Sequence, residues 1–488
     1  MDAEPRHLNP MLTPSVWTRR IAMGTVFETL IKETPGGYQP GLAKSWRVDP
    51  DGLTIYVELQ PNVTFHDGQP LTASDVQFSL DTARDPHKDA DHLRPLLADV
   101  TAVNKVGPRT VQLLLSRPNG YVLRALAEIP ILPYHVYDPN LVAGGKLVGT
   151  GPWSFVSWKD GVVRLTKYAG YWGRPAAIDD VEFVFQPDAA RALAGAKRGE
   201  LDIIPSLIPE HLQQAMSPGI ASSFAPLSLE PPRFRYLVLD TTAPPFDDVR
   251  VRRALALLVN RKALCTTFLH GLARPMTVPV WPGGPVDGPL PTAADFDPAA
   301  AGKLLDEAGW IDSDKDGIRD RGGQRLKIDL LLVERDEPPL PGKKLEGERQ
   351  QMVDLLNRAG FVVDVKLGTD AVVTKRLTDG HFGAALLEWD GMADSDLSRW
   401  IETNGTQNVG HFSSHRVDLI LAELRGDQTP AARAKHAAEL ELALADEQPF
   451  VVLAAPEPRG LVHRRVAGVV VWDGWIDLSA LSIDPAQQ

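Results

Sequence analysis

The sequence predicts an α/β protein with two or three domains, and three observations support this fold class. Strand-like runs alternate with amphipathic helical patterns along the chain, which is typical of layered α/β architecture rather than of a bundle or a sandwich. A chain of 488 residues is longer than one hydrophobic core usually serves. The charged fraction of 23% and the apolar fraction of 43% are those of an ordinary globular protein.

The N-terminal third is expected to contain two helices and several strands. Apolar residues have helical spacing over 21–31. Residues 54–59 alternate apolar and polar side chains like a half-buried strand. A capping residue at Thr72 or Ser74, followed by an acid, predicts the start of a helix. Further strands are expected at 111–115, 162–165 and 181–185.

Helices and strands continue to alternate toward the C-terminus. The expected helices, each supported by an apolar stripe or by capping residues, are 189–198, 249–258, 298–308, 351–358 and 431–447. The expected strands are 201–204, 236–239, 361–365, 450–454 and 469–472. The run 236–239 lies between Pro231-Pro232 and Pro244-Pro245, and a strand that enters proline-bounded connections is a candidate hinge. Residues 275–291 are rich in Pro and Gly and are expected to form a loop.

Charge, cysteine content and missing motifs exclude several classes of function. The net charge of −12 argues against nucleic-acid binding, which needs clustered Lys and Arg. No apolar run reaches the ~18 residues that a membrane span needs. Cys265 is the only cysteine, so no intramolecular disulfide can form, and its apolar helical surroundings predict a buried side chain. The usual hydrolase, metalloprotease, Walker and dinucleotide motifs are absent, which favours a protein that is not an enzyme.

A series of motifs in register gives the chain a family resemblance. The series begins with Leu8-Asn9-Pro10 and contains 40–46, 51–54, 63–76, 148–153, 171–175, 178–183, 199–202, 245–255 and 296–310. In this order the motifs resemble those of the peptide/nickel class of extracytoplasmic solute-binding proteins, which feed ABC importers. The resemblance implies a two-lobed, periplasmic-binding-protein-like fold of class II type with an extra subdomain. Lobe one would hold 1–237, with the extra subdomain at about 32–145; lobe two would hold 238–449, and 450–488 would return to lobe one.

The resemblance also implies where a ligand is held. The loop 388–396 looks like the family's Trp-x-Gly…Asp-Pro-Asp segment, with Ser395 where Pro is usual. From this loop and from other segments that line the ligand in the family, the expected ligand-binding residues are Trp17, Trp153, Tyr236, Trp389, Asp390, Gly391 and Asp394. For Trp389 the alternative is a plain core tryptophan.

Recognition of a peptide amine by this loop departs from the family pattern. In peptide binders of the family an aspartate inside the loop pairs with the ligand's α-amino group, since a desolvated ammonium needs a carboxylate partner. Here the residues between Gly391 and Asp394 are Met and Ala, although Asp390 or Asp394 could substitute. Asp394 has a second interpretation, as an N-terminal cap before a helix at 397–401. Our hypothesis is a small, largely neutral or cationic solute that stacks on Trp389.

Two short patterns raise the question of a metal. Asp312, Asp314 and Asp316 form the Asp-x-Asp-x-Asp-Gly core of a calcium loop, but Gly323 stands where the bidentate Glu is expected. The sequence therefore leaves open a structural Ca²⁺ or a hydrogen-bonded acidic turn, and no other cofactor is expected. His411 and His415 have i, i+4 spacing, which suits a metal pair on a helix but is more often found in ordinary polar histidines.

The resemblance implies the substrate-binding component of an ABC transporter. Such a protein captures a small solute, here an oligo- or dipeptide first, between two lobes by hinge closure and delivers it to the transmembrane permease subunits. The expected partners are the ligand and the permease, with no nucleic acid, and the protein is expected to be a monomer. The alternatives are a ligand sensor or regulator with the same fold, or a binder of a non-peptide solute or a nickel chelate.

The resemblance favours an exported protein in the periplasm or at the cell surface. No signal peptide precedes Asp2. The sequence is then either that of a cytoplasmic protein or a processed form with a start Met added, and the resemblance favours the processed form.

Overall fold

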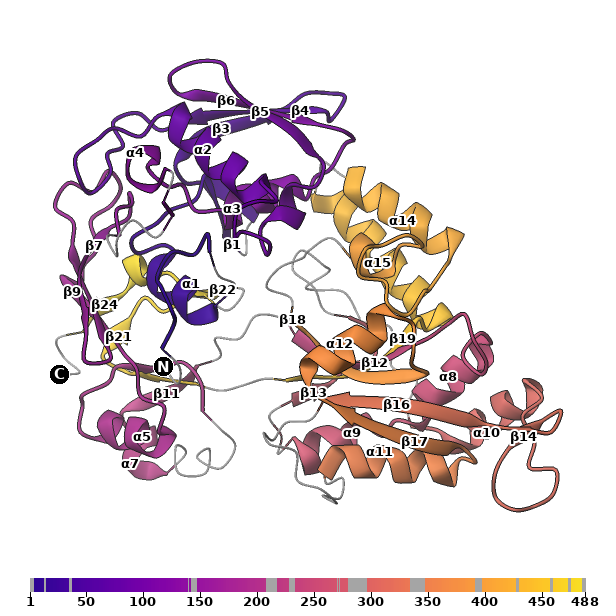
Figure 1. Cartoon of the computed structure of the whole chain (residues 1–488). Coiled ribbons are helices and arrows are strands. Elements are labelled where there is room, and N and C mark those ends of the chain that lie inside the picture. The colour runs from indigo at the N-terminus through magenta and orange to yellow at the C-terminus, as the bar shows by residue number, and fades with distance from the viewer. Residues whose placement is uncertain are drawn as a thin grey trace. The chain divides into compact units, whose positions relative to one another are not determined.

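The structure is a computed structural model with two compact units (Figure 1). It describes residues 4–12, 15–34, 37–138, 140–141, 147–207, 217–227, 233–269, 271, 273–279, 296–333, 347–390, 397–426, 430–456, 460–472 and 475–484. Unit one consists of Met1–Pro231 and Pro458–Gln488, and unit two consists of Pro232–Glu457. The chain therefore passes from one unit to the other twice.

Unit one is built from small antiparallel sheets. A four-stranded sheet has the order β3-β4-β6-β5, two three-stranded sheets have the orders β7-β8-β9 and β10-β20-β11, and three pairs are β1-β2, β21-β24 and β22-β23. The strands are β1 Ile31–Thr34, β2 Gly37–Pro40, β3 Ala43–Val48, β4 Thr54–Leu59, β5 Val100–Lys105, β6 Thr110–Leu115, β7 Trp153–Lys159, β8 Val162–Lys167, β9 Asp180–Val184, β10 Ile203–Ile204, β11 Phe224–Leu227, β20 Gly460–His463, β21 Val466–Ala467, β22 Val471–Trp472, β23 Trp475–Ile476 and β24 Ser482–Ile483.

Short helices complete unit one, and most of them lie near the four-stranded sheet in the sequence. They are α1 Val16–Ala22, α2 Ala73–Arg84, η1 Arg94–Leu97, α3 Val122–Glu128, α4 Tyr134–Tyr137, α5 Ala189–Lys197, α7 Pro218–Ala221 and η4 Leu478–Ala480. The start of α2 confirms the predicted cap and selects Thr72 from the two candidates. The Thr72 hydroxyl accepts from the Ser74 amide, and the Asp75 carboxylate accepts from the Thr72 amide.

The helix predicted at 21–31 is wrong. The helix α1 begins five residues earlier and ends at Ala22, with the Ser15 side chain accepting from the Thr18 amide at its start. Met23 is extended and Gly24 has a φ of 71°, so the backbone leaves the helical region at this point. The apolar residues after Gly24 are nevertheless buried, because this segment crosses the core of unit one in irregular conformation.

Unit two contains a mixed six-stranded sheet with the order β13-β19-β12-β18-β16-β17, and a separate hairpin of β14 and β15. Only the pairs β16-β17 and β16-β18 are parallel in this sheet. The strands are β12 Arg233–Leu239, β13 Ala273–Pro275, β14 Asp320–Arg321, β15 Gln324–Arg325, β16 Lys327–Val333, β17 Val362–Gly368, β18 Ala384–Asp390 and β19 Phe450–Pro456. The helices are α8 Val249–Leu258, α9 Arg261–Ala263, η3 Leu264–Phe268, α10 Pro298–Glu307, α11 Gly347–Arg358, α12 Asp370–Thr378, α13 Ser398–Ile401, α14 His415–Gly426 and α15 Pro430–Glu447.

Helices pack on both faces of the six-stranded sheet and give unit two two core clusters. Successive side chains of a strand point to opposite faces, so Leu237 and Leu239 lie in one cluster while Tyr236 and Val238 lie in the other. The first cluster includes residues of α8, α10 and α11, together with buried Cys265 as predicted. The second cluster includes residues of α12, α13, α14 and α15.

The unit boundaries differ from the lobes expected at 237 and 450. The strand β12 pairs along its whole length with β18, and it also pairs with β19. Both β12 and β19 therefore lie in the central sheet of unit two, and the return to unit one begins only after β19. A short apolar run between prolines predicts a strand, but it does not predict partners that lie about 150 residues further along the chain.

Candidate functional site

Five aromatic side chains of unit two form one cluster, which we call the aromatic cluster. Its members are Phe234 and Tyr236 of β12, Trp389 of β18, Trp400 of α13 and Phe450 of β19. Phe234 and Tyr236 are two residues apart and so share one face of the sheet. The antiparallel register places Trp389 directly opposite Phe234, which brings the Trp389 side chain onto this face.

The rings of the aromatic cluster are packed in defined geometries. Trp389 is stacked on Phe234 at a centroid distance of 5.0 Å and an angle of 25°. Trp400 lies 6.3 Å from Trp389 and is stacked on Phe450 at 4.4 Å. Tyr236 meets Trp400 edge-on at 5.0 Å. Such contacts add to the stability that burial provides, and the contact with Phe234 and Trp400 fixes the orientation of the Trp389 ring.

Trp389 is the one member of the aromatic cluster that keeps an accessible surface. Phe234 is 0% exposed, and the three other supporting rings are 5–7% exposed, whereas Trp389 is half-buried. A supported indole with one open side can stack against an apolar, planar or cationic group of a ligand. Tyr236 and Trp389, both expected to bind the ligand, thus belong to the same cluster, and their contact with a ligand stays a prediction.

The charged residues next to the aromatic cluster pair with each other on the other face of the sheet. Glu388 precedes Trp389, so its side chain points to the opposite face, where its carboxylate lies 3.2 Å from Nε of Arg235. Tyr236 is also electrically neutral at ordinary pH, because burial raises the pKa of its hydroxyl and outweighs a hydrogen bond with Trp400.

Two predicted ligand residues lie in unit one, and one of them is a core residue. Trp153 begins β7, is 0% exposed, and donates from Nε1 to the carbonyl of Ile178 at 3.1 Å. A fully buried indole with its only donor used has no surface for a ligand, so the structure corrects the expectation for Trp153. Trp17 is 8% exposed, with the Arg20 guanidinium 5.0 Å from its ring, and it lines a cavity of about 450 Å³ within unit one.

The remaining predicted ligand residues come at the end of β18. Asp390 is its last residue, and the structure does not describe its side chain. Gly391 and Asp394 lie outside the described residues. Their contact with a ligand, and the possible role of Asp394 as a cap, stay predictions.

A buried carboxylate that sequence reasoning missed holds two of the family motifs in place. Glu28 is 3% exposed and accepts hydrogen bonds from Thr150 Oγ1, Tyr171 Oη and Trp172 Nε1 at 2.8–3.0 Å. Burial raises the pKa of Glu28 despite these three donors and nearby Lys32. The motifs 148–153 and 171–175 therefore serve to build unit one. The only sequence signal for a buried partner such as Glu28 was the presence of polar and aromatic residues in these motifs.

The glycines of the motif 148–153 are explained by close backbone contacts. A Cβ atom on Gly149 would lie 1.9 Å from the carbonyl oxygen of Val26, and one on Gly151 would lie 2.0 Å from that of Thr25. No side chain can be accommodated at such distances, because the motif packs directly against the backbone of 25–26. These glycines are thus structural.

The acidic turn at 312–316 fits a hard cation only in part. Ligand atoms of Asp312, Asp314 and Asp316 lie within 4.8 Å of one another, and Asp312 Oδ1 is buried without a hydrogen-bond partner. However, one oxygen of each of the three carboxylates accepts a hydrogen bond from an amide of the turn itself, and Asp316 also pairs with Arg325 at 2.7 Å. Both alternatives from the sequence are therefore compatible with this geometry.

The two histidines with i, i+4 spacing, His411 and His415, do not lie on one helix. The helix α14 begins at His415, whereas His411 lies before it with a φ of 53° and has its Nδ1 3.5 Å from an Asp240 oxygen. The two residues are thus not arranged as a helical metal pair.

The comparisons with known proteins identify the family. Residues 37–410 match the family model described as bacterial extracellular solute-binding proteins, family 5, middle. The chain belongs to this family. The resemblance inferred from the motifs is thereby confirmed, and the protein is a solute-binding protein of family 5.

Relatives match this family 5 protein over nearly its whole length. Protein XP55 of Streptomyces lividans is 28% identical over 469 residues, which cover 92% of this chain and 82% of the relative. The dipeptide-binding protein of Escherichia coli K12 is 26% identical over 511 residues, covering 96% and 91%. The structure of HbpA2 from Haemophilus parasuis has a TM-score of 0.84 at 24% identity, covering 99% and 98%, which confirms the two-lobed α/β fold.

One further property of this family 5 protein comes from its helices. None of the helices in the described part of the chain combines the length and the apolar character that a membrane crossing requires.

Proposed function

We propose that this protein is the solute receptor of an ABC importer and that it binds a short peptide or a solute of similar size against Trp389. The observation that carries the proposal is the aromatic cluster, in which four buried rings support one half-buried indole. Membership of family 5 and similarity to a dipeptide-binding relative support the class of ligand. The ligand would place an apolar or cationic group on the open side of the indole.

A carboxylate next to Trp389 would complete the recognition of a peptide. A peptide carries an ammonium group, which needs a negative partner when it leaves water. The segment that follows Trp389 supplies three acidic side chains: Asp390, Asp394 and Asp396. We propose that one of them takes this role, because Glu388 is already paired with Arg235.

The rest of the proposal follows the family role. The protein would act as a monomer, would transform nothing chemically, and would hand its ligand to the transmembrane permease subunits from the periplasm or the cell surface. It would need no cofactor and no nucleic acid. The absence of known catalytic motifs and the acidic net charge support this reading.

Native mass spectrometry followed by a matched pair of variants tests the proposal. The purified protein is compared before and after denaturation, and a bound mass in the peptide range that vanishes on denaturation identifies the ligand. Trp389→Ala should then weaken binding of that ligand by about five- to thirtyfold, since a stacking contact of about 1–2 kcal/mol is lost. Trp158→Ala, which removes a half-buried tryptophan of unit one, should leave the affinity unchanged. Equal affinity of the Trp389 variant and the wild type would reject the proposed site.

A further inference from the structure

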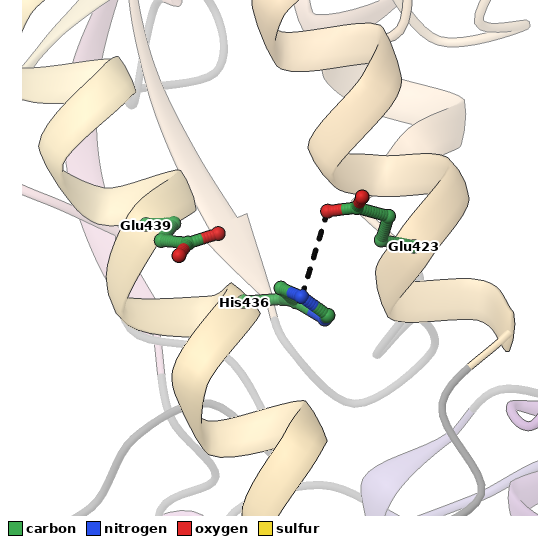
Figure 2. Close-up of side chains that lie close together, drawn as sticks. All are labelled: Glu423, His436 and Glu439. Carbon is green, nitrogen blue, oxygen red and sulfur yellow. Dashed lines mark ion pairs between the residues drawn. The ribbon is translucent and has the colours of Figure 1, made fainter.

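Three potential metal ligands face one another across two neighbouring helices of unit two. Glu423 lies on α14, and His436 and Glu439 lie on α15. Figure 2 shows the carboxylate of Glu423 directed at the imidazole of His436, with Glu439 one turn further along the same helix. Residues three apart on a helix share a face, so His436 and Glu439 are both presented toward α14.

The distances suit a small divalent cation. Nε2 of His436 lies 3.5 Å from Oε2 of Glu423, and the ligand atoms of all three residues lie within 4.8 Å of one another. Donors bound tetrahedrally to Zn²⁺ at about 2.1 Å are separated by about 3.4 Å, so one pair already has the required spacing. The third donor can close the remaining gap by rotation of the Glu439 side chain, which is 44% exposed.

The chemistry of the three donors favours zinc over calcium. One imidazole with two carboxylates is a set that Zn²⁺ binds, whereas Ca²⁺ and Mg²⁺ prefer oxygen ligands only. His436 is held in place, since its side chain is only 16% exposed, while Glu423 is 59% exposed and open to solvent. One competing cation is Lys435, whose ammonium lies 3.7 Å from Glu439 in a weak surface pair that a divalent ion can displace.

We propose that Glu423, His436 and Glu439 form a Zn²⁺ site that links α14 to α15, with water completing the coordination. The site would stabilise the helical pair that packs on one face of the sheet of unit two. Buried residues of both helices belong to the same core cluster as the supporting rings of the aromatic cluster, among them Leu421, Leu424, Leu440 and Leu444. The site does not depend on the proposed solute-binding function, because none of its ligands belongs to the aromatic cluster.

Calorimetric titration of the chelator-treated protein with ZnCl₂ tests the site. The wild type should bind Zn²⁺, and bound Zn²⁺ should raise its melting temperature until a chelator is added. His436→Gln should lose both effects, and Glu423→Gln and Glu439→Gln should weaken them. His135→Gln, which removes an exposed histidine of unit one, should bind Zn²⁺ like the wild type, and CaCl₂ should not replace ZnCl₂.

A structural readout separates this site from zinc bound elsewhere. Crystals grown with Zn²⁺ should show anomalous density between α14 and α15 at the zinc edge. Unchanged zinc binding in His436→Gln, or an anomalous peak only at other residues, would overturn the proposal. Affinity for the solute ligand should be the same in His436→Gln and in the wild type, so the two proposals can fail separately.

Discussion

Burial without a partner gives Glu441 an unusual acid–base property. Its side chain lies on the inner side of α15 and is 5% exposed, and no residue of the described chain pairs with its carboxyl group. Burial therefore raises the pKa of Glu441 from 4.5 to about 7. A carboxylate in such a place opposes folding at neutral pH, because the unfolded chain solvates the charge better.

The pKa of Glu441 predicts how Glu441→Gln changes stability with pH. Below pH 4.5 the carboxyl group is protonated in both states and has no effect. Between pH 4.5 and about 7 only the unfolded state ionises, so the wild type loses stability as the pH rises. Glu441→Gln should therefore be more stable than the wild type at pH 8, by up to about 3 kcal/mol, and the difference should shrink toward pH 5.

Urea denaturation at several pH values, with a chelator present, measures this difference. Glu58→Gln is the matched control, because its side chain is 51% exposed on a strand of unit one, and it should show no comparable pH-dependent gain. If the advantage of Glu441→Gln were the same at pH 5 and pH 8, the wild-type carboxyl group would have the same pKa in the folded and unfolded states, and the prediction would be wrong.

At the scale of elements, the sequence predicts best where one local signal suffices. The strand β4 and the helix α8 were predicted residue for residue, because an alternating pattern and an aspartate cap mark them clearly. The helix at 21–31 failed because its apolar residues are buried for a different reason, as irregular chain within the core. The spacing of apolar residues therefore predicts that a segment is buried more reliably than it predicts whether the segment is helical.

The aromatic cluster shows the same limit at the candidate site. The family pattern located Trp389 and Tyr236, but nothing in the sequence pointed to Phe234 and Trp400, which support them. Phe234 meets Trp389 only because β12 and β18 are paired in one particular register. Long-range pairing cannot be read from a single sequence, so a residue that lines a site is found more easily than the residues that hold it.

The hairpin of β14 and β15 carries a prediction about calcium. The carboxylate of Asp316 pairs with Arg325 of β15. In addition, Gly323 has no side chain at the position where a calcium loop has its bidentate Glu. We therefore expect millimolar CaCl₂ to leave the melting temperature of the wild type unchanged. A calcium-dependent rise that Asp312→Asn abolishes, while Asp418→Asn in α14, outside the turn, retains it, would contradict this expectation and establish a structural Ca²⁺.

At the scale of the whole molecule, the two units have separate hydrophobic cores. Among the described residues, each core cluster lies within one unit, three of them in unit one and two in unit two. Cores that do not share residues can unfold independently. We expect scanning calorimetry of the ligand-free protein to give a calorimetric unfolding enthalpy that is larger than the van't Hoff enthalpy, because the two are equal only for a single two-state transition.

A matched pair of core variants assigns the transitions. Leu113→Ala in β6 and Leu421→Ala in α14 each remove a side chain that is at most 1% exposed, and each should cost about 3 kcal/mol. Leu113→Ala should lower only the transition of unit one, and Leu421→Ala only that of unit two. Equal lowering of both transitions by each variant would show that the molecule unfolds as one cooperative body.

The same calorimetric scans show how a ligand is held once it is identified. A ligand that contacts only the aromatic cluster stabilises unit two and should raise its transition alone, since binding to the native form of one unit shifts only that equilibrium. The family's hinge mechanism requires a ligand to contact both lobes, and such a ligand must dissociate when either unit unfolds. Its presence should therefore raise both transitions and merge them, and Trp389→Ala should separate them again. A ligand that raises only the transition of unit two in the wild type would instead contradict capture between both lobes and would show that unit two alone holds the solute.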